Sequence, residues 1–313
     1  MIKAIDYNAT VVGIDHLTDS LAAFLIQSDR PPAKRPWFTA GQYCVLGLNN
    51  REKPELGSVR RAMSIASAPE AGGPLEFYIR YVARPASRNP LTHLLWKLET
   101  GARIHLHAVA AGVFTIKDTV GVDDRRLRVM VAAGTGSAPF VSMIRSEVCR
   151  DPRADLSKWV LLHGASHADE LGYRPELLAL SKSNGLKYWG TVSRPDETRE
   201  WIGDVGRVES FFEPDRLPDL EQRLGLESGD FTPDSAVVFV CGLTGTIAAA
   251  LVRLLDRGFI PNARVIREAL GVPPDVRPSL FYELYDPTPV IDVGDPSLIE
   301  SLRARLQTAL ARR

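Results

Sequence analysis

Hydrophobic positions in roughly the first 120 residues fall into six short runs separated by polar turn clusters. The runs are rich in valine, isoleucine, tyrosine and phenylalanine, the residue types that β-strands favour. They cover Ala9–His16, Leu21–Gln27, Tyr43–Leu48, Arg60–Ser67, Glu76–Val82 and Ile104–Ala108. Strands this short and this regularly spaced predict a small antiparallel barrel. One helix interrupts them, because Leu91, Leu94, Leu95 and Leu98 follow Pro90 at helical spacing.

Beyond a charged stretch at Asp118–Arg126, apolar runs alternate with segments of helix length. The runs are Arg128–Ala133, Lys158–His163, Leu186–Val192 and Ala236–Cys241, and the helices are Pro139–Cys149, Pro175–Ser183 and Thr244–Gly258. This alternation is typical of a parallel sheet with helices on both faces. The sequence therefore predicts a six-stranded antiparallel barrel over residues 1–122 and a parallel-sheet α/β domain over residues 123–285.

Residues 286–313 make a C-terminal extension in this division of the chain. We expect Pro287 and Pro289 to turn the chain, and Asp295 to cap a final helix that runs from Pro296. That helix carries one leucine stripe, formed by Leu298, Leu302, Leu306 and Leu310. We expect the stripe to pack on the barrel or on a second subunit, and the second case would give a homodimer.

Composition narrows the class of protein. The 313 residues include 45% hydrophobic and 24% charged residues, the balance of an ordinary globular protein. The 38 basic residues equal the 38 acidic ones, so no overall field exists to collect nucleic acid or anionic lipid. No apolar run reaches the length of about 18 residues that a membrane span needs. Three widely spaced cysteines suit a reducing compartment, and the histidine spacing predicts no metal site, so we expect a cytoplasmic enzyme.

Arg60–Ser67 is the first stretch that indicates chemistry. An arginine at a strand end offers a forked donor for phosphate, and Ser64 offers a hydroxyl that a flat ring could approach. A half-buried strand with its polar residues in water would have the same pattern. The stretch resembles the R-x-Y-S flavin motif of the plant-type ferredoxin–NADP reductase family. Leu75–Ile79 and Pro90–Leu94 resemble the family's next strand and its pyrophosphate-binding helix start.

Gly134–Phe140 follows a predicted strand and opens a helix. Glycines let the backbone approach a pyrophosphate, and a helix N-terminus offers free N–H groups, although any tight strand-to-helix turn also uses glycine. The segment is similar to the G-T-G-x-A-P-F segment of the same family. Further matches at His163–Ala165, Ser193–Arg194, Gly206–Arg207, Cys241–Gly242 and Glu283–Tyr285 extend the resemblance over about residues 5–286.

The resemblance implies two cofactors, FAD and NADP(H), and a set of contacts for each. The implied FAD contacts are Arg61, Ala62, Met63, Ser64, Phe77, Tyr78, Pro90, Leu91, Thr92, Thr135 and Tyr285. The implied NADP contacts are Gly134, Gly136, Ser137, Ala165, Ser193, Arg194, Arg207, Gly242, Leu243 and Thr244. Arg61 corresponds to the ligand of the flavin phosphate, and Arg194 and Arg207 correspond to arginines that bind the 2′-phosphate of NADP.

The resemblance also implies the residues at the reacting rings. Ser64 corresponds to a hydrogen-bonding residue, Cys241 to one beside the nicotinamide, Glu283 to an organising acid, and Tyr285 to the flavin cover. A cysteine on an apolar strand is by default a packed core thiol. The chain departs from the family at Met63, where the family usually has tyrosine, and at Ser166, where some bacterial members have a further arginine.

The function that the resemblance implies is electron transfer between NADPH and a one-electron carrier, a ferredoxin or flavodoxin, through FAD. Two alternatives remain open. The chain could be an NAD(P)H-dependent reductase component of an oxygenase, or a flavin or quinone reductase. From another class, it could be a non-catalytic flavin-binding subunit for electron transfer or regulation. The nucleotide motifs do not encode the acceptor.

Overall fold

The computed structural model describes residues 4–33, 36–197, 201–285 and 288–312. The chain forms two compact units. Residues 1–118 and 138–154 make up the first unit, and residues 119–137 and 155–313 make up the second. The two units are described separately below.

The first unit is built on the antiparallel barrel that the hydrophobic pattern predicts. Its strands are β1 (Ala9–Thr18), β2 (Leu21–Ser28), β3 (Tyr43–Asn49), β4 (Ser58–Ser64), β5 (Leu75–Arg80) and β6 (Arg103–Leu106). They lie in the order β4-β3-β6-β1-β2-β5, and an antiparallel bridge between Ile65 and Phe77 joins the chain beyond β4 to β5. Phe24, Leu46 and Phe77 are among the fully buried side chains of its core.

Short helices accompany the barrel. They are η1 (Pro54–Leu56), a 3₁₀ turn, and α1 (Leu91–Leu95), which ends before Leu98 although that leucine continues the predicted stripe. α2 (Ile116–Thr119) follows the last barrel strand. The pattern predicts no helix at α2, because its four residues are too few to show a period.

Helix α3 (Ala138–Arg150) belongs to the first unit, although the division of the sequence assigns it to residues 123–285. The Ser142 hydroxyl donates a hydrogen bond to the Ser67 carbonyl oxygen over 2.7 Å. The Arg145 guanidinium lies 2.9 Å from the Glu76 carboxylate, and both side chains are largely buried. These bonds fix α3 beside the chain that enters β5. The domain boundaries drawn from the sequence remain a prediction.

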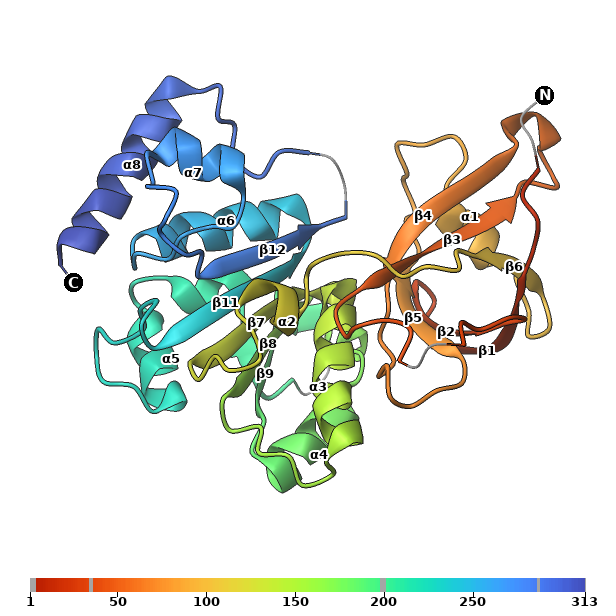
Figure 1. Ribbon diagram of the computed structural model, residues 1–313, viewed down its shortest axis with the longest axis horizontal. Helices are drawn as coiled ribbons and strands as arrows, with labels where there is room; N and C mark the ends of the chain where they lie inside the picture. Colours follow the sequence, from red (N-terminus) through yellow and green to blue (C-terminus); the bar gives the residue numbers. More distant parts are fainter. Residues whose placement is uncertain (1–3, 34–35, 198–200, 286–287, 313) are drawn as a thin grey trace. The chain divides into compact units, whose positions relative to one another are not determined.

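The second unit contains a six-stranded parallel sheet (Figure 1). Its strands are β7 (Leu127–Ala133), β8 (Trp159–Ala165), β9 (Lys187–Val192), β10 (Asp204–Val205), β11 (Ala236–Gly242) and β12 (Leu280–Leu284), in the order β10-β9-β8-β7-β11-β12. The pattern predicts the four inner strands, which are long and apolar, and misses the two edges. β10 has only two residues, and the last two residues of β12 belong to the segment interpreted as the Glu283–Tyr285 motif.

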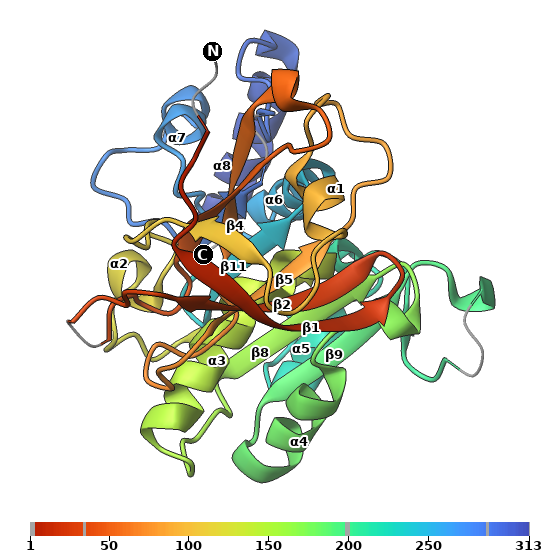
Figure 2. The same cartoon turned by 90° about the vertical axis from the view of Figure 1, so that its right-hand side faces the viewer.

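Helices and 3₁₀ turns connect these strands. The helices are α4 (Arg174–Asn184), α5 (Leu217–Leu224), α6 (Thr244–Leu255), α7 (Arg264–Leu270) and α8 (Pro296–Ala311). The 3₁₀ turns are η2 (Gly134–Ser137), η3 (Ala168–Glu170), η4 (Pro195–Glu197) and η5 (Val208–Phe212). α4 lies against β9, as Figure 2 shows. Within the described residues, no helix is both long and apolar enough to span a bilayer.

The C-terminal helix α8 packs on α6 and α7 (Figure 1). Packing on the barrel, the first of the two expected cases, is therefore wrong, because the buried face of the helix meets helices of its own unit. The second case, a homodimer, stays a prediction. Its buried side chains are Ile299, Leu302, Leu306 and Ala309, whereas Leu310 is 43% exposed. Twelve residues turn a helix by about 120° beyond whole turns, so Leu298 and Leu310 cannot share one contact line.

The start of α8 matches its prediction. The Asp295 carboxylate accepts hydrogen bonds from the backbone N–H groups of Ser297 and Leu298 over 3.0 and 3.1 Å. These bonds satisfy two amides that have no partner within the helix. The predicted turn at Pro287, and Asp286 where the extension begins, lie outside the described residues.

Candidate functional site

Residues predicted to contact NADP follow the carboxyl ends of five parallel strands. Along the sheet these are Arg207 after β10, Ser193 and Arg194 after β9, Ala165 at the end of β8, Gly134–Ser137 after β7, and Gly242–Thr244 at the end of β11. Parallel strands present all these positions at one edge. The strand order reverses between β7 and β11, and open α/β sheets bind ligands outside the strand ends at such a reversal.

The glycine-rich turn η2 is shaped by close backbone contact. A Cβ atom on Gly136 would lie 2.1 Å from the carbonyl oxygen of Cys241, so no other residue fits there without a shift. Gly134 has a φ of +55°, and its carbonyl oxygen accepts a hydrogen bond from the Ser137 hydroxyl over 3.1 Å. The ends of β7 and β11 therefore meet where the sheet order reverses.

Thr135, Cys241, Glu283 and Tyr285 come together at the same place. Cys241 is fully buried and pairs in register with Glu283 on the neighbouring strand. The Cys241 thiol donates to the Tyr285 hydroxyl over 3.2 Å, and that hydroxyl donates to the Thr135 carbonyl oxygen over 3.3 Å. Burial raises the pKa of the Cys241 thiol far above its usual range, and the nearby Glu283 charge raises it further. The thiol therefore keeps the proton that it donates.

The ends of β8 and β9 carry a charged cluster. The backbone N–H of Arg194 donates to the Ser166 carbonyl oxygen over 3.0 Å, which brings the two strand ends together. One carboxylate oxygen of Glu197 lies 2.8 Å from His167 Nε2 and 3.7 Å from Arg194 Nη1. The hydrogen bond from His167 is the largest cause that lowers the pKa of Glu197, and the charge of Arg194 adds to it. His167 and Arg194 thus share one anionic partner.

Arg207 also has an acidic neighbour. Its guanidinium lies 3.6 Å from Oε1 of Glu209, a residue that is only 3% exposed. Among the described residues, Glu209 Oε2 is buried and has no hydrogen-bond partner. The sequence reasoning missed His167, Glu197 and Glu209. A signal was present, because an acid follows each arginine by two or three positions.

A buried histidine lies near the end of β8, the strand beside the glycine-rich turn. His163 is fully buried at the end of β8, and its Nδ1 lies 3.4 Å from the Tyr188 hydroxyl. Burial lowers the pKa of His163 to about 4, so its ring is neutral at physiological pH. This histidine is part of the core and not an ionic contact.

The residues predicted to contact FAD lie on the first unit, except for Thr135 and Tyr285. On β4, Arg61 and Ala62 are exposed, Met63 is half-buried and Ser64 is buried. The Arg61 side chain donates to the neighbouring Arg60 carbonyl oxygen over 2.7 Å. An exposed guanidinium on a strand leaves most of its donors available to a phosphate.

The remaining predicted FAD contacts are mostly buried. Phe77 is fully buried in the barrel core and Tyr78 is 4% exposed, so their side chains offer little surface to a cofactor. Leu91 and Thr92 are buried at the start of α1, directly after Pro90. The Thr92 hydroxyl accepts a hydrogen bond from the Val82 backbone over 3.4 Å. α1 has only five residues, so its dipole is shorter than that of an ordinary helix.

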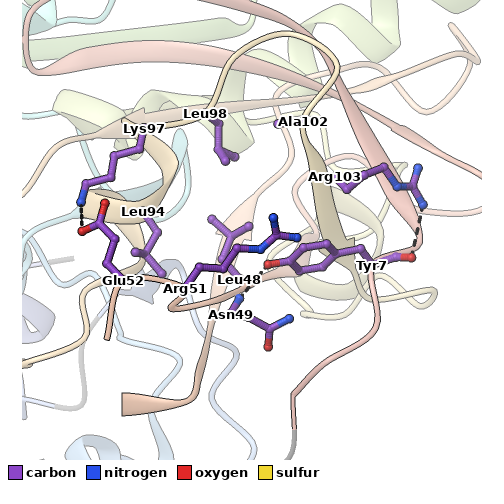
Figure 3. A pocket seen from close by; sticks show the side chains of 10 residues that line it. All are labelled: Tyr7, Leu48, Asn49, Arg51, Glu52, Leu94, Lys97, Leu98, Ala102 and Arg103. Atoms are coloured by element: carbon purple, nitrogen blue, oxygen red, sulfur yellow. Dashed lines mark hydrogen bonds and ion pairs between the residues drawn. The ribbon is translucent and has the colours of Figure 1, made fainter. Parts of the chain in front are cut away.

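A pocket of about 320 Å³ lies in the first unit, apart from all these residues (Figure 3). It is lined by Tyr7, Leu48, Asn49, Arg51, Glu52, Leu94, Lys97, Leu98, Ala102 and Arg103. Two of its cations have anionic partners, since Lys97 pairs with Glu52 over 2.5 Å and Arg103 pairs with Asp29. Within the described part of the chain, no group of His, Cys, Asp or Glu side chains is placed to hold a metal ion.

Comparison with known proteins gives consistent matches. The model of the oxidoreductase NAD-binding domain family matches residues 130–251. Ferredoxin–NADP reductase B of Sorangium cellulosum is 33% identical over 288 residues, which cover 91% of this chain and all of that protein. Methane monooxygenase component C of Methylosinus trichosporium is 32% identical over 56% of this chain and 47% of its own length.

The fold is also that of a solved structure. A ferredoxin–NADP reductase from Neisseria gonorrhoeae, crystallised with FAD and NADP, superposes with a TM-score of 0.69 at 24% identity. The match covers 89% of this chain and 98% of that one. The architecture of an antiparallel barrel and a parallel α/β sheet is therefore shared with that structure.

Proposed function

Because the chain belongs to the ferredoxin–NADP reductase family, we propose that it is an FAD-dependent oxidoreductase that passes electrons between NADPH and a ferredoxin or flavodoxin. The observation that carries this proposal is the row of nucleotide-binding candidates along one edge of the parallel sheet. The resemblance selects these residues, and the strand order independently brings them to one edge.

The residues present fit both cofactors. For FAD, the exposed guanidinium of Arg61 is a suitable phosphate ligand, with Met63 and Ser64 following it on the same strand. For NADP(H), Gly136 permits close backbone approach at the turn, and Arg194 and Arg207 have side chains that are 59% and 73% exposed. FAD supplies the chemistry that links two-electron and one-electron transfer.

We propose positioning roles for the residues around Cys241. The Tyr285 ring would cover a bound flavin until the nicotinamide arrives, and the hydrogen bonds of its hydroxyl to Cys241 and Thr135 set its orientation. Burial keeps the Cys241 thiol protonated, and the charge of Glu283 beside it adds to this effect. Ser64 would donate or accept a hydrogen bond at the flavin ring. None of these roles requires a nucleophile or a general base.

Stopped-flow spectroscopy of the purified protein tests the proposal. Rapid mixing with NADPH should bleach the flavin absorption, and the reduced protein should then pass electrons to a ferredoxin or a flavodoxin. Arg61→Ala should weaken FAD binding by about 1.5–3 kcal/mol, the range for a hydrogen bond to a charged group. A protein that purifies colourless and gains no thermal stability from added FAD would contradict the proposal.

A second candidate is the reductase component of an oxygenase. The similarity to methane monooxygenase component C favours it, although this chain spans about half of that protein. Three cysteines are too few to hold an iron–sulfur cluster of the four-thiolate type within this chain. Electron transfer to an oxygenase, with none to ferredoxin or flavodoxin, would favour this candidate. Negligible oxidation of NADPH with ferricyanide would favour a non-catalytic flavin subunit.

We also propose a cytoplasmic location for the enzyme. Cys44, Cys149 and Cys241, all within the described residues, form no disulfide. Unpaired cysteines are the rule in compartments that keep thiols reduced. A fractionation experiment with an antibody to the chain would test this location.

A further inference from the structure

The charged cluster after β8 and β9 contains an acid where the proposed function needs only cations. Building on that proposed function, we propose that Glu197 determines the choice between NADPH and NADH. Its carboxylate binds His167 and Arg194, the side chains that a 2′-phosphate would contact, so NADPH must displace it and NADH need not.

The geometry places Glu197 in direct competition with a phosphate. Its carboxylate oxygen Oε2 is within 2.8 Å of His167 Nε2 and 3.7 Å of Arg194 Nη1. Both partners follow neighbouring strand ends, which the bond from the Arg194 amide to Ser166 holds together. In nucleotide-binding sheets, an arginine in this region suits a 2′-phosphate, and a carboxylate suits the 2′-hydroxyl of NAD. This cluster contains both.

The cluster also has a low net charge. Arg194 is balanced by Glu197, and Arg207 lies 3.6 Å from the buried Glu209. His167 has a second carboxylate near it, that of Glu170, whose Oε2 lies 3.9 Å from Nδ1. Ser166, in place of a further arginine, adds no charge. A 2′-phosphate carries close to two negative charges. It therefore meets two arginines whose charges two carboxyl groups already offset.

Glu197 is able to leave its partners. Its side chain is 59% exposed, and so is that of Arg194. An ion pair this open to water is weak, because solvent screens the two charges. When NADPH binds, its 2′-phosphate replaces the carboxylate as the partner of Arg194 and His167, and Glu197 turns into solvent. When NADH binds, Glu197 stays in place and accepts a hydrogen bond from the ribose hydroxyl.

Binding of two nucleotide fragments to the FAD-loaded protein tests this directly. Calorimetry with 2′,5′-ADP reports the phosphate contact, and 5′-AMP reports the rest of the adenosine site. In Glu197→Gln, which keeps the shape and removes the charge, 2′,5′-ADP should bind about 3- to 10-fold more tightly. Binding of 5′-AMP should change by less than about twofold, because the amide oxygen of the variant still accepts the hydrogen bond from its 2′-hydroxyl and no phosphate meets the changed charge.

Asp196→Asn is the matched control. Asp196 precedes Glu197 in η4 and is exposed, and no ion pair or hydrogen bond of its side chain occurs among the described residues. The same loss of charge there should change 2′,5′-ADP binding by less than about twofold, since an exposed charge without contact is screened. An equal gain in both variants would overturn the proposal, because it would reflect general charge and not competition.

Two further outcomes separate this inference from the function on which it rests. If the wild type binds 2′,5′-ADP through Arg194, as a loss in Arg194→Ala would show, and Glu197→Gln binds it equally or more weakly, Glu197 is not a competitor. In that case the proposed function stands and the inference falls. If neither the wild type nor Glu197→Gln binds 2′,5′-ADP, the NADPH assignment and the inference fall together.

Discussion

Two pairs of strand ends along the proposed nucleotide-binding edge are built in different ways. At β7 and β11, Gly136 touches the backbone of Cys241, and Tyr285 bonds to a thiol that is fully buried. At β8 and β9, Arg194 and Glu197 pair through exposed side chains. The first end is defined by steric fit between strands, and the second by charges in water.

This difference predicts different sensitivities. Buried contacts cannot rearrange without moving the backbone, so changes there should alter stability and be insensitive to salt. Exposed ion pairs are weak and screened, so changes there should alter ligand choice and leave stability nearly unchanged. Evolution of cofactor preference would then be easier at the β8–β9 end. The following predictions test this contrast, starting with the largest effect.

The largest loss of stability is expected in the helices that pack behind the β7–β11 strand ends. α6 begins directly after β11, and Leu302 of α8 packs into the core on which α6 lies, with 1% exposure. Leu302→Ala should destabilise the protein by about 2–5 kcal/mol through the cavity it leaves. Urea unfolding measures this change.

Leu310→Ala provides the control on the same helix. Leu310 is 43% exposed, so its truncation should cost no more than about 0.5 kcal/mol. Similar losses for both leucines would mean that α8 packs with another face. A change in oligomeric state with Leu310→Ala would support the homodimer that the leucine stripe indicates.

At the glycine turn, Gly136→Ala should destabilise the protein by about 1–3 kcal/mol, because the new Cβ meets the Cys241 carbonyl oxygen. The loss should be the same at low and high salt. In Gly245→Ala, at the start of α6, the new Cβ meets nothing within 4 Å, and stability should stay level or rise. Thermal unfolding of both variants measures the difference. A melting temperature of Gly136→Ala equal to that of the wild type would contradict the steric explanation of the turn.

At the charged end, Arg194→Ala should lower kcat/KM for NADPH about tenfold, the loss of one charge-assisted contact. Turnover with NADH and the melting temperature should hardly change. The preference of the wild type for NADPH should decline as ionic strength rises, because the contact is exposed. Steady-state kinetics with both cofactors at two salt concentrations measures this. An equal loss with both cofactors would make Arg194 a structural residue.

The smallest effect is expected for Tyr285→Phe. This change removes only the hydroxyl that forms hydrogen bonds with Cys241 and Thr135. It should lower the free energy of unfolding by about 0.5–1.5 kcal/mol. The aromatic ring stays, so flavin reduction should keep its rate within a few-fold. Tyr285→Ser, which removes the ring, should instead tighten nicotinamide binding and slow turnover through product release. If both variants behave alike, the ring does not cover the flavin.

The strands and the glycine turn can be predicted from the sequence, but the contacts between them cannot. The four inner strands of the parallel sheet are long apolar runs, and the glycines after β7 stand out by type. The backbone contact between Gly136 and Cys241 cannot be predicted, because it joins positions more than a hundred residues apart. The same holds for the Tyr285 hydroxyl and Thr135.

The charged end shows the opposite case. Arg194 and Glu197 are three residues apart, so their pairing is local and was open to prediction. The resemblance to a known family drew attention to the arginines and not to the acids beside them. The prediction that α8 packs on the barrel failed for a further reason. A helix pattern shows which residues are apolar but not which surface they meet.

The order in which the chain visits its two units has a consequence for modular dissection. The chain passes from one unit to the other after residues 118, 137 and 154, so neither unit is a continuous segment. A fragment that stops at residue 122 would lose α3, and with it the partner of the Phe114 ring and of the Glu76 carboxylate. A recombinant exchange of flavin modules between such reductases must therefore transplant residues 138–154 together with the barrel.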